Sequence, residues 1–135
     1  MSVFPQKQRV PTSKCLTCGK GWIEFESFCF FLSRERHTWS ESRVDCQNRG
    51  GDLAILDQDR VKNFLSQKSK DLYWIGLNRS PSGVWAWVDG SALGKSNWSK
   101  EPGQADCVYM DGEGDQSWRT SKCSYVSFYI CQKNR

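Results

Sequence analysis

Seven cysteines in a chain of 135 residues constrain this sequence more than any other feature. A domain of this size buries only a modest core, and small extracellular domains commonly supplement such a core with disulfide bonds. We therefore expect structural disulfides and an oxidising compartment. Six cysteines can pair in many ways, so the residues alone leave the connectivity open.

Cys15 and Cys18 form a Cys-x-x-Cys pair that allows three interpretations. A zinc ribbon would need a second such pair or two histidines, and His37 is the only histidine. A redox motif would begin a helix after a strand, which residues 19–21 do not favour. Structural disulfides are the interpretation that we favour.

Residues 1–17 have the composition of a stalk or linker, and we expect residues 18–135 to form one domain. The net charge of +4 comes entirely from four residues near the start, Lys7, Arg9, Lys14 and Lys20. The remaining chain is neutral and lacks the basic surface that nucleic-acid binding requires.

The start of the chain has neither a signal peptide nor an apolar run that could span a membrane. A disulfide-rich chain of this kind is expected to be the extracellular fragment of a longer membrane protein. Met1 would then be an added start residue.

A continuous apolar run, Tyr73-Trp74-Ile75-Gly76-Leu77, predicts a central strand buried on both faces. Shorter strands are predicted within residues 22–32, at 107–110, near Trp118 and at 127–131. Residues 53–56 predict a short buried strand or connector. Residues 78–106 have no sustained period, and a loop region of this length in a compact domain is commonly functional.

Two helices are predicted before the central strand. Thr38 and Glu41 match a capping box, and the first helix should end at residues 50–51, both glycine. Its buried stripe would hold Trp39, Arg43 or Val44, and Cys46. The second helix is predicted to start at Asp57 in the same way, with an apolar face of Val61, Phe64 and Leu65.

The order of these landmarks resembles that of C-type lectin-like domains over residues 18–133. The matching landmarks are Cys18 with Trp22 and Cys29, Cys46 in the first helix, Trp74-Ile75-Gly76-Leu77, Trp85-x-Trp87-x-Asp89-Gly90, Cys107, Cys123 and Tyr129-Ile130-Cys131. The resemblance implies an α+β fold with two helices, two small antiparallel sheets and a long loop region. It also implies three intrachain disulfides, Cys18–Cys29, Cys46–Cys131 and Cys107–Cys123.

Sugar-binding members of that family hold calcium through a Glu-Pro-Asn or Gln-Pro-Asp triplet, a further acidic residue and a Trp-Asn-Asp triplet. Calcium takes about six to eight oxygen ligands. Here Glu101-Pro102-Gly103 lacks the amide, and Asp106 is the carboxylate left before Cys107. After Trp118, Arg119 and Thr120 replace the Asn and Asp. We therefore expect no metal site, no cofactor and no calcium-dependent sugar binding of the usual kind.

A lectin-like scaffold without these ligands is similar to the natural-killer-cell receptor branch of the family and its myeloid relatives. The resemblance implies a type II plasma-membrane receptor that binds a protein ligand, either MHC class I-like or lectin-like, through the loop face. The unassigned Cys15 would link two chains into a dimer. The alternative is a glycan-binding lectin, calcium-independent or with a degraded calcium site, that would contact a glycan through Trp98, Glu101 and Trp118. A secreted lectin-like toxin or coagulation-type subunit is a third interpretation.

The predicted ligand-binding residues combine aromatic and arginine anchors with polar groups, as protein-binding patches do. They are Lys95, Asn97, Trp98, Lys100, Glu101, Gln104, Tyr109, Asp111, Glu113, Asp115 and Arg119. The ordinary alternative is that Trp98 packs into the core and that the acidic turn, residues 111–115, is solvated. The other tryptophans of this region are expected in the core: Trp74, Trp85, Trp87 and Trp118.

Two further features complete the sequence-based predictions. Asn78 and Asn97 each begin a glycosylation sequon. His37 lies beside a helix start, with no nucleophile placed near it by the sequence, so we expect no enzymatic activity.

Overall fold

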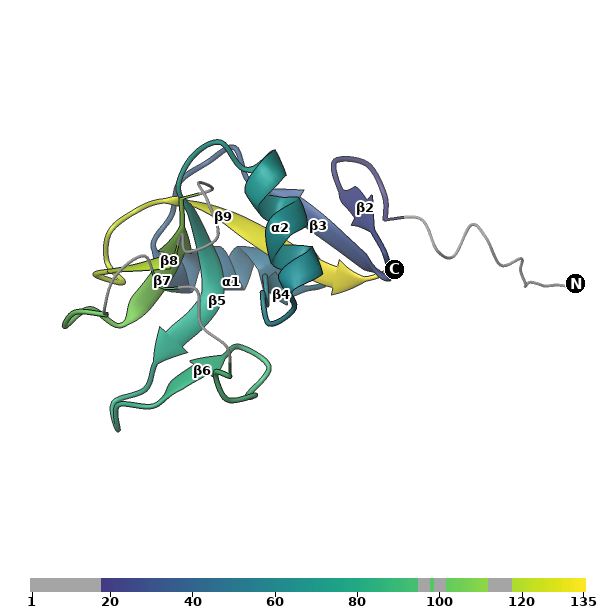
Figure 1. The fold of residues 1–135 in the computed structure, drawn as a ribbon. Coiled ribbons are helices and arrows are strands. Elements are labelled where there is room, and N and C mark those ends of the chain that lie inside the picture. The colour runs from purple at the N-terminus through teal and green to yellow at the C-terminus, as the bar shows by residue number, and fades with distance from the viewer. Residues whose placement is uncertain (1–17, 95–97, 99–101, 112–117) are drawn as a thin grey trace, which may run out of the picture.

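The computed structural model describes residues 18–94, 98, 102–111 and 118–135 (Figure 1). Its elements in chain order are β2 (Ile23–Phe25), β3 (Phe28–Leu32), α1 (Trp39–Asn48), β4 (Asp52–Leu53), α2 (Asp59–Lys68), β5 (Tyr73–Arg79), β6 (Trp85–Trp87), β7 (Cys107–Met110), β8 (Trp118–Ser121) and β9 (Phe128–Asn134). The α+β fold class is confirmed. Neither helix of the described part has the length and apolarity needed to cross a bilayer.

The strands form one eight-stranded sheet in the order β2-β3-β9-β5-β7-β8, with β4 beside β9 and β6 beside β5. Two antiparallel groups correspond to the two small sheets that were expected. They are joined where β5 and β9 run side by side in the same direction, with Tyr73 opposite Phe128. This short parallel pairing makes the two groups one continuous sheet.

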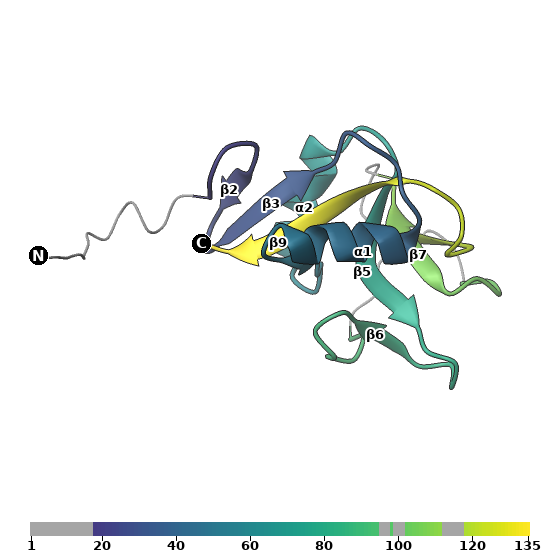
Figure 2. The same cartoon turned by 180° about the vertical axis from the view of Figure 1, so that it is seen from behind.

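The two helices lie on opposite faces of this sheet, as Figures 1 and 2 show from front and back. On one face, Val61 and Leu65 of α2 pack in a buried cluster with Ile75 and Leu77 of β5. On the other face, the cluster under α1 contains Trp74. Because neighbouring residues of a strand point to opposite faces, β5 supplies side chains to both cores. The prediction of a central strand buried on both faces is confirmed.

The predicted capping box at the start of α1 is confirmed. The Glu41 amide donates to the Thr38 hydroxyl (3.2 Å), and the Thr38 amide donates to the Glu41 carboxylate (3.1 Å). Hydrogen bonding of the Glu41 carboxylate to the Thr38 amide, and secondarily to the Thr38 side chain, lowers the pKa of Glu41. The buried stripe consists of Trp39, Ser42 and Cys46. Of the two alternatives predicted for the middle of the stripe, Arg43 is half-buried and Val44 is 54% exposed.

The predicted start of the second helix was also wrong, although its apolar face is correct. The backbone at Gln58 is still extended, and α2 begins at Asp59 without a side-chain cap. Asp57 therefore lies one residue too early to act as the N-cap. Val61 and Leu65 are buried as predicted, and Phe64 stacks on Phe25 with ring centroids 4.2 Å apart.

Three disulfide bonds connect the elements. Cys46–Cys131 joins α1 to β9 across 85 residues, Cys18–Cys29 closes the β2–β3 region, and Cys107–Cys123 closes the region of β7 and β8. These are the pairings that the resemblance implied. Cys15 lies outside the described residues.

Gly76 allows β5 to approach the connector that follows β4. Its amide donates to the carbonyl oxygen of Ala54 at 2.7 Å. A Cβ atom at this position would lie 2.9 Å from the carbonyl oxygens of both Leu53 and Ala54. The glycine that interrupts the apolar run is thus required by close backbone packing, and this packing sets the position of the central strand.

Candidate functional site

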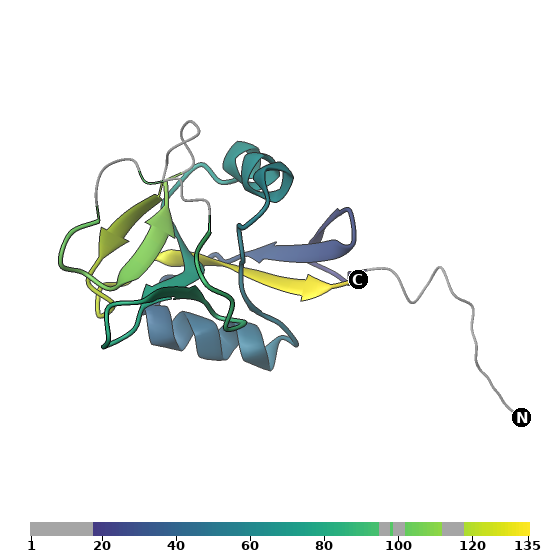
Figure 3. The same cartoon turned by 60° about the horizontal axis from the view of Figure 1, so that its bottom comes forward.

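The candidate ligand-binding face lies at the end of the molecule that carries β5 to β8 and their connections (Figure 3). The C-terminus lies at the other end, where the Arg135 amide donates to the carbonyl oxygen of Ser27 at 3.0 Å. The face is therefore remote from the chain end. We define the loop half of the domain as β5, β6, β7, β8 and their connections, and the chain-end half as the rest of the described residues.

Four tryptophans pack together in the loop half. Trp118 is fully buried, and Trp87 and Trp98 meet its ring at centroid distances of 5.4 and 5.9 Å. Trp85 packs against Trp98, with ring centroids 5.0 Å apart. Trp85 and Trp98 are half-buried, so Trp98 belongs both to the core and to the surface. Packing of Trp98 into the core is therefore compatible with a ligand contact by the same side chain.

The loop Pro102–Asp106 comes just before β7 and is held by Arg79, the last residue of β5. The Arg79 guanidinium donates to the Asp106 carboxylate at 2.9 Å. It also donates to the carbonyl oxygens of Gly103 (2.9 Å) and Ala105 (2.8 Å). The Gly103 amide lies 3.5 Å from the Thr120 hydroxyl, which connects the loop to β8. Gly103 and Thr120, which belong to the two sequence triplets that calcium binding would require, are thus close in space.

A second arginine, Arg119, lies on the face of β8 opposite to that of its neighbour Thr120. Its guanidinium is 3.1 Å from the Asp111 carboxylate, and Tyr109 is its cross-strand partner. Tyr109 packs edge-on against Trp74, with ring centroids 6.2 Å apart. The Asp111 side chain is only 13% exposed, so the expectation of a solvated acidic turn was wrong for this residue.

The structure divides the predicted ligand-binding residues into separate places. Trp98 lies on the face of Trp118, whereas Tyr109, Asp111 and Arg119 lie on the face covered by α1. Gln104 is exposed on the loop. The alternation of side chains along β7 and β8 causes this division. The remaining predicted residues, Lys95, Asn97, Lys100, Glu101, Glu113 and Asp115, lie outside the described residues.

The described residues of this face do not fit the calcium shell of the sugar-binding members. Gly103 has no side-chain oxygen, and Arg119 is a cation. The carboxylates of Asp106 and Asp111 are each paired with an arginine. Within the described ranges, no group of three or more His, Cys, Asp or Glu side chains could hold a metal ion.

His37 contacts charged and aromatic groups near the start of α1. Its ring nitrogens lie 3.4 Å from Glu35 and 3.8 Å from Glu41, and its ring is 5.8 Å from that of Tyr129. Its backbone pairs with Ser127. These contacts place His37 at the junction of α1 and β9.

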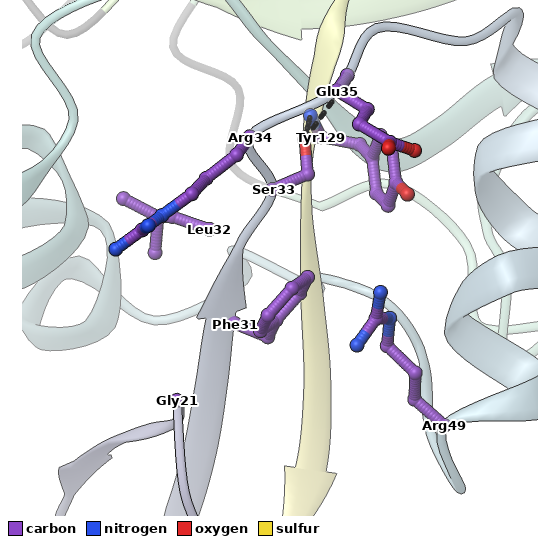
Figure 4. A pocket seen from close by; sticks show the side chains of 8 residues that line it. All are labelled: Gly21, Phe31, Leu32, Ser33, Arg34, Glu35, Arg49 and Tyr129. Atoms are coloured by element: carbon purple, nitrogen blue, oxygen red, sulfur yellow. Dashed lines mark hydrogen bonds between the residues drawn. The ribbon is translucent and has the colours of Figure 1, made fainter.

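A hollow with a volume of about 360 Å³ lies between the end of β3, β9 and the end of α1 (Figure 4). Arg49 stacks 4.0 Å above the Phe31 ring and donates to Asp45 at 2.8 Å. The Arg49 guanidinium is thus already partnered within the chain. Sequence-based reasoning did not point to this hollow, whose lining residues are Gly21, Phe31, Leu32, Ser33, Arg34, Glu35, Arg49 and Tyr129.

Beside this hollow, the Tyr129 hydroxyl donates to the Asp45 carboxylate at 2.6 Å. Burial and this hydrogen bond raise the pKa of Tyr129. Burial alone would raise the pKa of Asp45, but the hydrogen bonds from Tyr129 and Arg49 outweigh it and lower that pKa. These groups form a charged contact between α1 and β9.

Of the two sequon asparagines, Asn78 lies within β5 between Ala86 of β6 and Cys107 of β7. It is half-buried. Asn97 lies outside the described residues. Glycosylation at either position remains a prediction.

Comparison with known proteins identifies a matching family, similar sequences and solved structures of similar fold. The family described as "Lectin C-type domain" matches residues 35–133. "CD209 antigen-like protein A" of Mus musculus is 37% identical over 129 residues, covering 88% of this chain and 53% of that protein. "C-type lectin domain family 17, member A" of Homo sapiens is 34% identical over 125 residues, covering 87% and 32%. The chain therefore spans about half or less of the length of these relatives.

Two solved structures illustrate the range of similar proteins. The C-type lectin domain of murine dendritic cell inhibitory receptor 2, solved in complex with N-glycan, superposes with a TM-score of 0.81 at 25% identity, covering 88% of this chain and all of that one. A calcium-independent type II antifreeze protein superposes with a TM-score of 0.80 at 26% identity, covering 88% and 95%. Both chains share the scaffold described above.

Proposed function

The chain belongs to the family of lectin C-type domains, and from that premise we propose that it recognises a protein ligand without calcium. In this proposal residues 18–135 are the ligand-binding domain of a type II cell-surface immune receptor, and residues 1–17 are its stalk. The observation that carries the proposal is the contact between Arg119 and Asp111 (3.1 Å). A guanidinium occupies the sequence position that would supply a calcium ligand and already uses the neighbouring carboxylate.

The charges on the loop half support calcium independence. A calcium ion would have to displace Arg119 from Asp111 and Arg79 from Asp106 before either carboxylate could become a ligand. Gly103 itself adds no side-chain oxygen. Among the described residues, the number of available side-chain oxygens then falls well below the roughly six that calcium requires.

The spread of the candidate residues favours a protein over a small sugar. Trp98 lies on one face of the β7–β8 region, and Tyr109 and Arg119 lie on the other. A protein interface of about 800 Å² on each partner can contact both sides of such an edge, whereas a single sugar residue cannot. Exposed arginine and half-buried tryptophan are also the side chains that most often anchor protein interfaces.

Glycan binding is the second candidate function, because a murine relative of similar fold was solved with an N-glycan. In this chain the alternative depended on Trp98, Glu101 and Trp118. Trp118 is fully buried and offers no ring face to a sugar. Glu101 lies outside the described residues, so Trp98 is the member of this set whose described ring reaches the surface.

Staining of cells with a fluorescent tetramer of the domain separates the two candidates. We expect staining to persist in chelator and after enzymatic removal of N-glycans, and to be lost after surface proteolysis. Arg119→Glu should weaken staining about tenfold, as expected for an interface anchor. Lys20→Glu, at an exposed residue of the chain-end half, is the control and should leave staining unchanged. Loss of staining in chelator or after glycan removal would favour the lectin.

Membership of the natural-killer-cell branch and dimer formation remain parts of this proposal. Cys15 would provide the interchain disulfide, and a dimer would raise the apparent affinity through avidity. Non-reducing electrophoresis of the secreted chain should show a covalent dimer that is absent from the Cys15→Ser variant. A monomer in both samples would contradict the dimer.

A further inference from the structure

Arg79 has a role that the sequence analysis did not assign. We propose that Arg79 is a positioning residue that orders the loop Pro102–Asp106 as a bound cation would. The inference deepens the proposed function and rests on it, because it explains how the loop keeps its shape without calcium. Arg79 itself is only 21% exposed and is not proposed to touch the ligand.

The first argument is the convergence of oxygen atoms on one guanidinium. The carbonyl oxygens of Gly103 and Ala105 lie 2.9 and 2.8 Å from Nη2, and the Asp106 carboxylate lies 2.9 Å from Nε. Carbonyl and carboxylate oxygens that converge in this way are the ligands that calcium prefers. Here the planar guanidinium, with several fixed donors, satisfies all three oxygens at once.

The second argument is that Arg79 is held rigidly. It ends β5, and its backbone amide donates to the Asp106 carbonyl oxygen at 2.8 Å. Its guanidinium lies 4.8 Å from the centroid of the Trp85 ring, and Arg79 and Trp85 are cross-strand partners. The cation is thus fixed to the strand and to an aromatic ring before it meets the loop. A group fixed in advance loses little entropy when it forms these contacts.

The third argument is that the other described contact of the loop is weak. The Gly103 amide lies 3.5 Å from the Thr120 hydroxyl, at the outer limit of a hydrogen bond. Arg79 therefore supplies the short and charge-assisted contacts of the segment. Gln104 is exposed between two residues whose carbonyl oxygens Arg79 holds. Ordering by Arg79 fixes the backbone on either side of Gln104 at the candidate ligand-binding face.

Hydrogen exchange followed by mass spectrometry tests this role in the intact chain, without any ligand. In Arg79→Gln, we expect peptides covering residues 102–106 to exchange about tenfold faster or more, since charge-assisted hydrogen bonds are among the strongest in proteins. Peptides from β3 and β9 should exchange as in the wild type. The control Arg49→Gln removes an arginine that pairs with Asp45 in the chain-end half and should leave residues 102–106 unchanged.

Arg79→Lys keeps the charge but donates from a single point, so its loop should exchange at a rate between those of wild type and Arg79→Gln. This variant also serves as the test if Arg79→Gln does not fold. Wild-type exchange rates at residues 102–106 in both variants, or equal acceleration throughout the domain, would overturn the inference. Repeating the wild-type measurement with calcium and with chelator examines the proposed function separately. Slower exchange of the loop in calcium would contradict calcium independence, whatever the Arg79 variants show.

Discussion

Both halves of the domain contain paired strands, but the chain-end half has two disulfides, whereas the loop half has one disulfide and relies more on side-chain contacts. In the chain-end half, β9 pairs with β3 over five residues and with β4 over two. In the loop half, β7 pairs with β8 over four residues, and a tryptophan cluster and the arginines Arg79 and Arg119 add side-chain contacts to the sheet and to the loop Pro102–Asp106. The chain-end half, which we call the frame, thus relies more on disulfides, and the loop half, which carries the binding face, relies more on side-chain contacts.

This difference explains how one scaffold can carry different binding chemistry. Backbone ladders and disulfides depend little on the identity of surface side chains. The contacts of Arg79 and Arg119 depend on two side chains, and either can change without disturbing β3 or β9. The solved relatives, one with an N-glycan and one calcium-independent, have the same scaffold.

The largest expected effect comes from comparing disulfides of the two halves. Replacing Cys46 and Cys131 by alanine opens a closure of 85 residues and should lower the free energy of unfolding by about 4 to 5 kcal/mol. Replacing Cys107 and Cys123 opens a closure of 16 residues and should cost about 3 kcal/mol. Denaturant unfolding of both double variants measures the difference. A greater loss for the Cys107–Cys123 pair would contradict the division of roles.

A smaller effect is expected at Asp45, in the chain-end half. Hydrogen bonds from Tyr129 and Arg49 hold the pKa of Asp45 below its ordinary value of 3.8 in the folded state. The stabilisation is therefore present above pH 3.8 and is lost as the pH falls through the lower folded-state pKa. Asp45→Asn should lose about 1 kcal/mol at neutral pH, because the contact is partly exposed, and should show a weaker dependence on acid. Thermal melting of the wild type and of Asp45→Asn at a series of acidic pH values measures this effect. Equal losses of stability with falling pH in the two proteins would argue against this assignment.

Much of the frame could be predicted from local sequence patterns. The capping box of Thr38 and Glu41, the apolar run of β5 and the alternation before Leu32 each report on structure within a few residues. The start of α2 was missed by one residue, because Asp57 resembles a cap and Gln58 does not. The disulfide pairing came from the resemblance, since spacing alone could not select it.

The candidate site was predictable only in part, because its contacts join distant segments. Arg79 and Asp106 are 27 residues apart, and no local pattern connects them. Tyr109 and Trp98 were grouped by their sequence neighbourhood, yet the alternation of strand residues places them on opposite faces. Strict alternation along residues 107–110 and 118–121 is enough to separate the two faces from the sequence alone.

Calcium titration by isothermal calorimetry, together with thermal melting in calcium and in chelator, tests the central claim most directly. The account predicts no saturable heat and identical melting curves, because arginines already hold the carboxylates of Asp106 and Asp111. Saturable binding would raise the free energy of unfolding by about 2.7 kcal/mol at a calcium concentration 100 times the Kd. That result would contradict calcium independence and identify the loop half as a metal-dependent site.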